Sequence, residues 1–455
     1  MSCRRQVPTS VAVMSAPATD LLKRQVRSTV EALADELIEL STRIRDNPEL
    51  GFSEAETART VAEWLGQRGL RCTYVGDTAL LASVEAPDPG HSVALLGELD
   101  AVHVPTHPDA DARTGAAHAC GHHASLAAAC GAAVAVSEVM PDLSGRLVFV
   151  GTPAEEIRPA TQARDRSDGE LPTGKSELIR LRVFDDVDLA LMVHTGREHG
   201  PRFSVGDTLN GAVRVTAEFV GRAAHSGSSP WLGVDATRAA RLAMDAVDAQ
   251  RDQFDPADEV RIGQQLEALP AALGATPASA RLHLLVRARS LDALRGALAR
   301  LDRALYAGAI AIGAKLTRDT ELLYVPHRSS HALDDVVEAN ATEVVGREEH
   351  ARGRHLGACS DIGDLARVIP VSHPYASGAV GQHHAANFRV VDHAQATVEP
   401  ATYLAMTIVD LLADGSTQAR KVIETDPPQM SREAYLRLRS EFASTRDHWP
   451  EVATE

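Results

Sequence analysis

Short apolar runs alternate with amphipathic helical patterns along the first 200 residues of the chain. Runs at residues 93–96, 147–150 and 189–193 indicate strands, and apolar residues spaced in threes and fours at 20–46 and 54–69 indicate helices. Such alternation is typical of a mostly parallel sheet covered by helices on both faces. Because these sheets bind ligands beyond the carboxyl ends of their strands, the residues that follow the runs are candidates for a functional site.

A different pattern begins near residue 208. Its expected elements form a β-α-β-β-α-β series, the ferredoxin-like order, at residues 213–220, 234–249, 259–264, 280–287, 291–311 and 315–323. Beyond it, strand segments near 368–369 and 380–388 and a helix at 398–412 complete the first domain. The predicted fold is therefore an α/β catalytic domain with an inserted ferredoxin-like α+β domain.

These patterns also give domain boundaries. We predict a disordered leader at 1–19, the catalytic domain at 20–207 and 326–425, the inserted domain at 208–325 and a polar C-terminal tail with one amphipathic helix at 426–455. A length of 455 residues is enough for two cores.

The composition of the chain limits the kinds of molecule that it is expected to bind. The formal net charge of -16 argues against nucleic acid or an anionic membrane as the main partner, and no run approaches about 20 apolar residues. Five scattered cysteines are poor material for a disulfide framework, so we expect a cytoplasmic protein that acts on a small molecule.

Six consecutive residues carry a cysteine and three histidines: His118-Ala119-Cys120-Gly121-His122-His123. A single cysteine before an apolar helix is usually a buried hydrophobic residue. With imidazoles this close, a thiolate is better explained as a metal ligand. Cys120 and His122, two residues apart, can reach one ion.

The ends of two later strands supply further candidates. Glu155 and Glu156 follow the run at 147–150, and a continuing strand directs their side chains to opposite sides, so that one binds metal and the other acts as a general base. Acidic residues at the start of a helix are the alternative. His194 follows the run at 189–193 as a further ligand, and Asp100 is placed to support a ligating histidine.

In the segment Gln382-His383-His384-Ala385-Ala386-Asn387-Phe388, either histidine is a possible ligand, and both are possible ordinary loop residues. The pattern alone leaves this choice open.

The order of these motifs resembles the M20 family of metallopeptidases and amidohydrolases. The resemblance is carried by six segments, 118–122, 153–156, 193–194, Gly221-Arg222-Ala223-Ala224-His225-Ser226, Ser360-Asp361-Ile362-Gly363-Asp364 and 384–388, and it extends from about residue 28 to 415. Residues 96–101 and 371–375 are similar to the branch that contains aminobenzoyl-glutamate hydrolase and peptidase M20 domain-containing protein 2.

The resemblance implies roles for individual residues. It makes Glu155 the general base that takes a proton from water and later protonates the leaving amine, and it makes His118 a supporting residue. The implied ligands of one or two zinc or manganese ions per subunit are Cys120, His122, Glu156, His194 and His384.

The resemblance also assigns roles to the inserted domain. It implies that His225 stabilises developing negative charge in a neighbouring subunit, and that Arg287 binds a substrate carboxylate. The inserted domain then serves as a lid and as the interface of a homodimer or higher homo-oligomer. Without the family, His225 would be interpreted as a surface histidine.

Three departures from the family pattern bear on the substrate. His123 replaces an acidic or amide residue and becomes a supporting residue of altered character, Asp235 replaces an asparagine, and residues 157–173 replace a glycine-rich stretch.

The first hypothesis is a metal-dependent hydrolase of a C–N bond in a small carboxylate-bearing substrate, such as an N-acyl or aminobenzoyl amino acid or a dipeptide. The alternative is a hydrolytic deaminase of an aminoaromatic acid that releases ammonia, as in the similar 5-nitroanthranilate aminohydrolase. A non-catalytic metal-binding module is the third, and the presence of Glu155 speaks against it.

Overall fold

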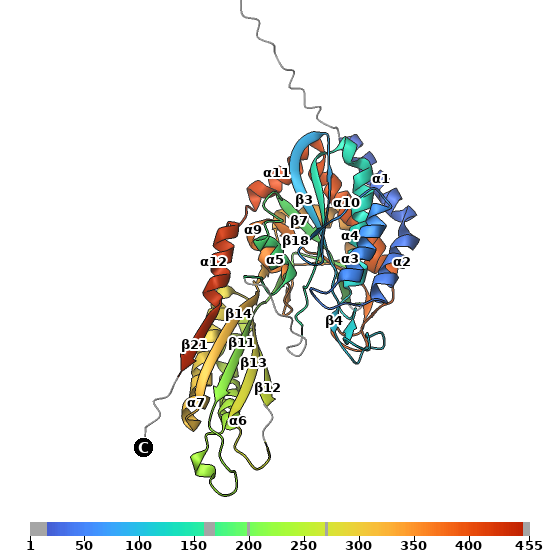
Figure 1. Ribbon diagram of the computed structural model, residues 1–455. Coiled ribbons are helices and arrows are strands. Elements are labelled where there is room, and N and C mark those ends of the chain that lie inside the picture. Colours follow the sequence, from blue (N-terminus) through green and yellow to red (C-terminus); the bar gives the residue numbers. More distant parts are fainter. Residues whose placement is uncertain (1–15, 159–168, 198–200, 269–271, 449–455) are drawn as a thin grey trace, which may run out of the picture. The chain divides into compact units, whose positions relative to one another are not determined.

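The apolar runs of the sequence form the centre of a six-stranded sheet. The computed structural model describes residues 16–158, 169–197, 201–268 and 272–448 (Figure 1). The chain divides into two compact units, and the first comprises the described residues of Met1–Asp207, Ser329–Arg354 and Leu365–Gln429. Its sheet has the order β1-β2-β6-β3-β7-β18, with strands β1 (Thr73–Val75), β2 (Ala79–Glu85), β6 (Ser144–Thr152), β3 (Asp88–Glu98), β7 (Leu189–Met192) and β18 (Val371–Ser372).

The four strands from β6 to β18 are parallel to one another, and β2 joins β6 antiparallel. Helices α1 (Ala16–Ala32), α2 (Ala34–Arg45), α3 (Ala55–Gly66), α4 (His122–Val139) and α10 (Glu399–Leu412) lie on one side of this sheet, and α5 (Gly174–Arg180) lies on the other (Figure 1). The first unit also contains α8 (His331–Val345) and α11 (Thr417–Thr425). This is the predicted α/β arrangement.

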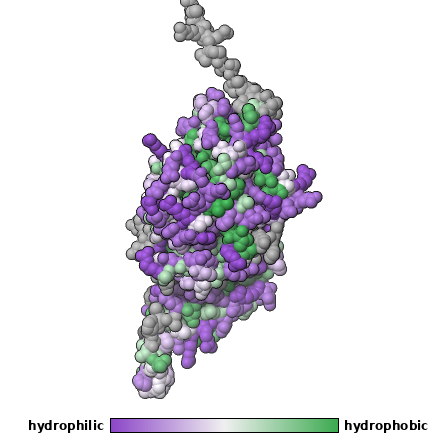
Figure 2. Space-filling view, turned by 90° about the vertical axis from the view of Figure 1, so that its right-hand side faces the viewer, coloured by the Kyte–Doolittle hydropathy of each residue, from purple (hydrophilic) through white to green (hydrophobic). Residues whose placement is uncertain are grey.

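Helix α4 forms the centre of the core. Sixteen of its residues are buried, among them Leu126, Val134 and Val136. The segment His122–Asp142 is long and apolar enough to cross a membrane, but 83% of its most apolar stretch is buried inside the protein, as in a core helix. The face seen in Figure 2 is mainly hydrophilic, with hydrophobic residues in small separate patches.

The second unit comprises the described residues of Thr208–Arg328, His355–Asp364 and Met430–Glu455. Its antiparallel sheet has the order β12-β13-β11-β14-β21, from β12 (Arg261–Ala268), β13 (Ser279–Ala288), β11 (Gly211–Val220), β14 (Lys315–Tyr324) and β21 (Ser444–His448). Helices α6 (Ala236–Asp248) and α7 (Leu291–Ile312) complete the ferredoxin-like order that the sequence predicts.

The structure differs from the sequence interpretation in the C-terminal region. The predicted tail contains a helix as expected, α12 (Arg432–Phe442), but it also contains strand β21, which was not predicted and which pairs with β14 and extends the second sheet. The predicted leader lies outside the described residues up to position 15, and residues 16–19 belong to α1.

Two short strands were also placed differently. Val368 ends helix α9 (Ile362–Val368), and the strand follows at β18. The segment predicted at 380–388 is a loop after β19 (Tyr375–Val380), because the chain turns at Gly381, with a φ of 85°, and again at His384. In the first unit β19 pairs with β8 (His194–Arg197), β9 (Phe203–Val205) and β20 (Arg389–Val390), and β9 pairs with β16 (His350–Arg352).

Candidate metal centre

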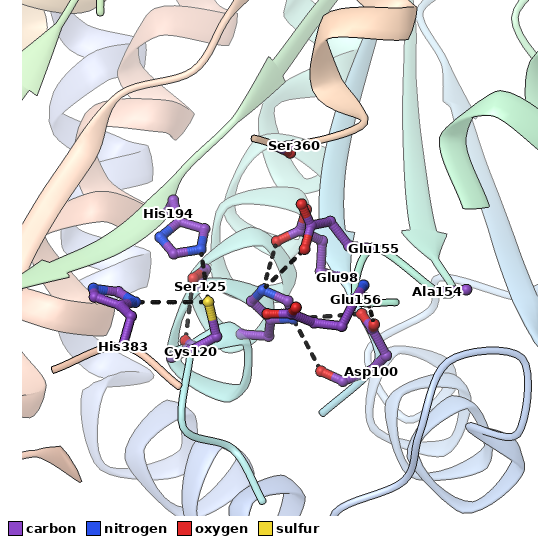
Figure 3. Close-up of polar contacts among 12 residues, drawn as sticks. Glu98, Asp100, Cys120, Ser125, Ala154, Glu155, Glu156, His194, Ser360 and His383 are labelled. Carbon is purple, nitrogen blue, oxygen red and sulfur yellow. Dashed lines mark hydrogen bonds and ion pairs between the residues drawn. The ribbon is translucent and has the colours of Figure 1, made fainter. Parts of the chain in front are cut away.

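The candidate site lies where the central parallel strands end. Strand β3 ends at Glu98 and leads to Asp100, β6 leads to Glu155 and Glu156, and β7 leads to His194. Because β6, β3 and β7 are neighbours in the sheet, their carboxyl ends bring these side chains to one edge (Figure 3). The sequence prediction of a site at the strand ends corresponds to this arrangement.

The turn before α4 delivers Cys120 and His122 to the same place. Gly121 has a φ of 91°, and a Cβ at this position would lie 2.6 Å from the Cβ of Thr195. Only glycine fits both the left-handed backbone and this close approach. The turn therefore places the thiol and the first residue of α4 beside the end of β7.

Two groups of potential ligands share the sulfur of Cys120. One comprises Cys120, His122 and His194, and the other comprises Cys120, Glu156 and His384. In each group the ligand atoms lie within 4.8 Å of one another. The Cys120 Sγ lies 3.5 Å from His194 Nε2, and His384 Nε2 lies 2.9 Å from a carboxylate oxygen of Glu156.

The imidazoles are oriented for ligation through Nε2. His122 Nδ1 lies 2.9 Å from the carbonyl oxygen of Asp100, and His194 Nδ1 lies 2.9 Å from that of Thr195. A carbonyl oxygen only accepts hydrogen bonds, so in each neutral ring Nδ1 carries the proton and donates it. The Nε2 lone pairs are then directed into the site, as in metal-ligating histidines.

The charges of the site also suit a cation. Burial would raise the pKa of the Cys120 thiol, but the neighbouring His194 and His122 hold it well below its usual value. A thiolate and several carboxylates thus converge on buried imidazole nitrogens, and His122 Nε2 has no hydrogen-bond partner among the described residues. This donor set fits a zinc-like divalent ion.

Asp100 and Glu155 flank the ligands. Asp100 is fully buried and accepts a 2.7 Å hydrogen bond from the backbone nitrogen of Glu156, so it holds the Glu155-Glu156 step against the His122 turn. A carboxylate oxygen of Glu155 lies 4.0 Å from His122 Nε2. The structure therefore places the predicted base beside a predicted ligand and Asp100 behind it.

His118 and His123 lie apart from the ligand groups. Their rings are buried, with centroids 5.3 Å apart and planes tilted by 56°, and burial lowers the pKa of His118 to about 3. Neither residue belongs to a metal-binding group of the described residues. Most of the unusual 157–173 segment, residues 159–168, lies outside the described residues.

Two residues of the site, Glu98 and Lys175, were not singled out from the sequence, and His383 was named there only as the alternative to His384. Glu98 lies 3.3 Å from His122 Nε2, Lys175 is bonded to Glu98, and His383 Nδ1 lies 3.6 Å from Cys120 Sγ. Since side chains two apart on a strand share a face, Glu98 was detectable from Asp100. Both histidines of the 383–384 pair reach the site, and His384 does so at a φ of 62° with its backbone nitrogen bonded to Ala119.

The two candidates of the second unit are described within that unit. His225 is exposed, and its Nδ1 accepts hydrogen bonds from the backbone nitrogens of Gly227 and Ser228 at 3.1 and 3.0 Å. The proton of its neutral ring must then reside on Nε2, which makes the exposed nitrogen a donor. Arg287 lies half-buried on β13, opposite Ala212 and Arg261.

A parallel sheet whose strand ends bring together a thiol, imidazoles and carboxylates has the donor groups that a metal-dependent hydrolase needs. Residues 94–407 match the description of Peptidase family M20/M25/M40, and the chain belongs to this family. It is therefore a metal-dependent enzyme that hydrolyses C–N bonds.

The comparisons with individual proteins agree with this assignment. The chain is 26% identical over 435 residues to the Xaa-Arg dipeptidase of Mus musculus, covering 89% of this chain and 92% of the relative. It is 32% identical over 235 residues to a p-aminobenzoyl-glutamate hydrolase chain of Escherichia coli, covering 49% and 44%. A solved structure of a dinuclear metal-binding M20 peptidase from Bacillus subtilis has a TM-score of 0.64 at 18% identity, covering 84% of this chain and 99% of that one.

Proposed function

We propose that the protein is an amidohydrolase or dipeptidase that cleaves the amide of a small carboxylate-bearing substrate, such as an N-acyl amino acid, an aminobenzoyl amino acid or a dipeptide. One observation carries the proposal: the Glu155 carboxylate lies 4.0 Å from His122 Nε2, beside two ligand groups that share Cys120. A base next to a paired metal site is suited to hydrolysis. The relatives named as an Xaa-Arg dipeptidase and an aminobenzoyl-glutamate hydrolase support the substrate class.

Cys120, His122 and His194 would hold one divalent ion, and Cys120, Glu156 and His384 a second, with zinc or manganese as the metal. When bound, such ions polarise the scissile carbonyl and lower the pKa of water. Glu155 accepts the proton of the attacking water and returns it to the leaving nitrogen. Asp100 fixes His122 and the backbone of Glu156, and thereby orients this base and its neighbours.

Two residues of the second unit have side chains suited to the substrate. The Nε2–H of His225 suits an oxyanion donor, because the Nδ1 contacts fix the tautomer that donates. The guanidinium of Arg287 suits a substrate carboxylate. We place these two residues in a homodimer or higher homo-oligomer formed through the second unit, in a cytoplasmic protein without a nucleic-acid or membrane partner.

A substrate screen with the Glu155→Gln variant tests the proposal. The zinc- or manganese-loaded protein is assayed against Xaa-Arg dipeptides, acyl amino acids, aminobenzoyl-glutamate and substituted anthranilates, with separate detection of amines and ammonia. We expect amide cleavage, and a loss of about 100- to 10,000-fold in kcat for Glu155→Gln at unchanged metal content. Glu338→Gln, on α8 and paired with His350, is the control and keeps full activity.

Ammonia release from an anthranilate without any amide cleavage would replace this function by the deaminase alternative. Full activity of Glu155→Gln would remove the assigned base.

A further inference from the structure

The backbone adopts a strained conformation directly before the proposed base. Ala154, between the end of β6 and Glu155, has a φ of 46° and is 2% exposed. A residue with a side chain is disfavoured in this left-handed conformation, which persists only where the surrounding structure holds it. Because the conformation of Ala154 sets the direction of the chain that follows, it also sets where the Glu155 carboxylate lies.

Two hydrogen bonds hold the backbone of this residue. The backbone nitrogen of Ala154 donates a 2.8 Å hydrogen bond to Glu54 Oε1, and its carbonyl oxygen accepts one of 3.0 Å from the backbone nitrogen of Gly174. Both polar groups of the Ala154 backbone are thus bonded to other segments of the first unit. Of the two partners, only Glu54 acts through its side chain.

Glu54 is held in place by further bonds. It is fully buried, its Oε1 also accepts from the backbone nitrogen of Phe52 at 2.8 Å, and its Oε2 accepts from the Thr78 hydroxyl at 2.7 Å. Phe52, with a φ of 58°, is a second left-handed residue bonded to the same oxygen. Burial, followed by the nearby charge of Asp100, raises the pKa of Glu54 to about 7. The group therefore does not need to be ionised to accept these bonds.

The position of Glu54 in the chain predicts a different use for its side chain. It is the N-cap residue of α3, yet its side chain makes no hydrogen bond to that helix. The start of α3 is bonded instead to Glu49, which accepts from the backbone nitrogens of Glu56 and Thr57 at 3.2 and 2.8 Å. Stabilisation of α3 therefore does not explain the three bonds of the Glu54 carboxylate.

The turn that carries Glu54 also lies against the backbone around the base. A Cβ on Gly51 would lie 2.8 Å from the Cα of Ala154 and 3.3 Å from the carbonyl oxygen of Glu156. Only glycine permits this approach. The turn and the segment that carries the base are thus in direct backbone contact, which limits how far Glu54 can move from Ala154.

We propose that Glu54 is a positioning residue that holds Ala154 in its left-handed conformation and thereby fixes the Glu155 carboxylate beside the metal centre. This inference rests on the proposed role of Glu155 as the base. A neutral amide of the same length should replace Glu54, because the oxygen of glutamine accepts from both backbone nitrogens and its nitrogen donates to the Thr78 hydroxyl.

A set of variants at two positions tests the proposal. The zinc-loaded proteins Glu54→Gln, Glu54→Leu, Ala154→Gly and Glu54→Leu/Ala154→Gly are compared in kcat and KM on the amide that the wild type cleaves. Crystal structures of the same proteins give the φ of residue 154 and the position of the Glu155 carboxylate. Glu49→Leu is the matched control, because Glu49 lies in the same segment and also accepts from two backbone nitrogens, but these belong to α3.

We expect kcat to fall about 100-fold in Glu54→Leu, because a base displaced by about 1 Å loses about this much. KM should stay close to the wild-type value, since the base acts on water. Ala154→Gly alone should be close to wild type, and in the Glu54→Leu background it should raise kcat about 5- to 30-fold, because glycine adopts the left-handed conformation without strain. Glu54→Gln should keep most of the activity.

Glu49→Leu should lower the melting temperature and keep the wild-type kcat. A wild-type kcat in folded Glu54→Leu, an equal loss in Glu49→Leu, or no gain from Ala154→Gly would overturn the proposal. If Glu54→Leu does not fold, Glu54→Asp replaces it with the same expectations, because its carboxylate is one methylene shorter.

A wild type that cleaves no amide would count against the proposed function. The crystal structures would then decide the positioning role: a displaced Glu155 carboxylate in Glu54→Leu would support it, and an unmoved one would contradict it.

Discussion

Two buried polar clusters, one in each unit, differ in whether their polar atoms have hydrogen-bond partners. In the second unit, Asp364 accepts hydrogen bonds from Arg439 at 2.6 Å and from Tyr435 at 2.8 Å, and its other oxygen accepts from the backbone nitrogen of Val325. In the first unit, His122 Nε2 and Glu98 Oε2 lie 3.3 Å apart, and neither atom has a hydrogen-bond partner among the described residues.

The difference in hydrogen bonding distinguishes a cluster that stabilises the fold from one that could bind a ligand. A cluster in which donors meet acceptors is complete by itself and fixes the position of α12 against β14. A cluster in which imidazole nitrogens meet carboxylates is complete only with a proton or a metal ion between them. The unsatisfied cluster is therefore the one to test for metal.

The largest effect is expected from the sulfur that both ligand groups share. Cys120→Ser should remove at least half of the bound zinc and lower kcat/KM about 1,000-fold or more, because a neutral hydroxyl replaces a thiolate in both groups. Metal analysis and steady-state kinetics measure this. Cys130→Ser, in the middle of α4, is the control for cysteine loss, and a Cys120→Ser enzyme with full zinc content would contradict the shared-ligand arrangement.

The second-largest effect is expected in the second unit, where a substitution should lower stability without changing metal binding. Arg439→Met should lower the free energy of unfolding by about 3 to 5 kcal/mol, because it leaves Asp364 buried without its cation. Denaturant titration measures the loss, and zinc content should stay at the wild-type level. Loss of zinc in a folded Arg439→Met protein would erase the distinction between the two clusters.

The smallest effect concerns a carboxyl group neutralised by a proton. Burial raises the pKa of Asp334 to about 7, although the hydroxyls of Ser372 and Ser329 donate to it. The unfolded pKa is about 3.9, so the folded state binds the extra proton between these values. This stabilisation is complete below about pH 4 and is lost as the pH rises through 7.

The free energy of unfolding of the wild type should fall as the pH rises from 5 to 8, and Asp334 accounts for part of this fall. Because the side chain of Asp334→Asn cannot ionise, the fall in the variant should be smaller by about 2 to 3 kcal/mol. Urea titrations of the metal-free protein at several pH values check this. An unchanged pH slope in the variant would show that Asp334 is ionised when folded.

The fold could be predicted from the sequence more completely than the site. The apolar runs and helical periodicity predicted the parallel sheet and the ferredoxin-like order. The runs are strands buried on both faces, as in β7, whereas β13 of the second unit is buried on one face, and both patterns are local. The tail strand β21 was missed, since its pairing with β14 joins segments more than 120 residues apart and its own sequence, Ser444–His448, is polar. Only tertiary pairing makes it a strand.

For the site, residues at strand ends and in the Cys120–His122 turn were recognisable, because each motif has a local signal. The choice between His383 and His384 was not, since the loop conformation places both rings near Cys120. Lys175 gave no local signal either, as its meaning comes from Glu98 on a distant strand.

The most direct test of the account is a crystal structure of the zinc-loaded protein with anomalous data at the zinc edge. We predict two anomalous peaks near Cys120, one within bonding distance of Cys120, His122 and His194 and one within bonding distance of Cys120, Glu156 and His384. A zinc-loaded protein whose peaks lie away from the Cys120 sulfur would contradict the central claim that this thiolate joins the two halves of the site.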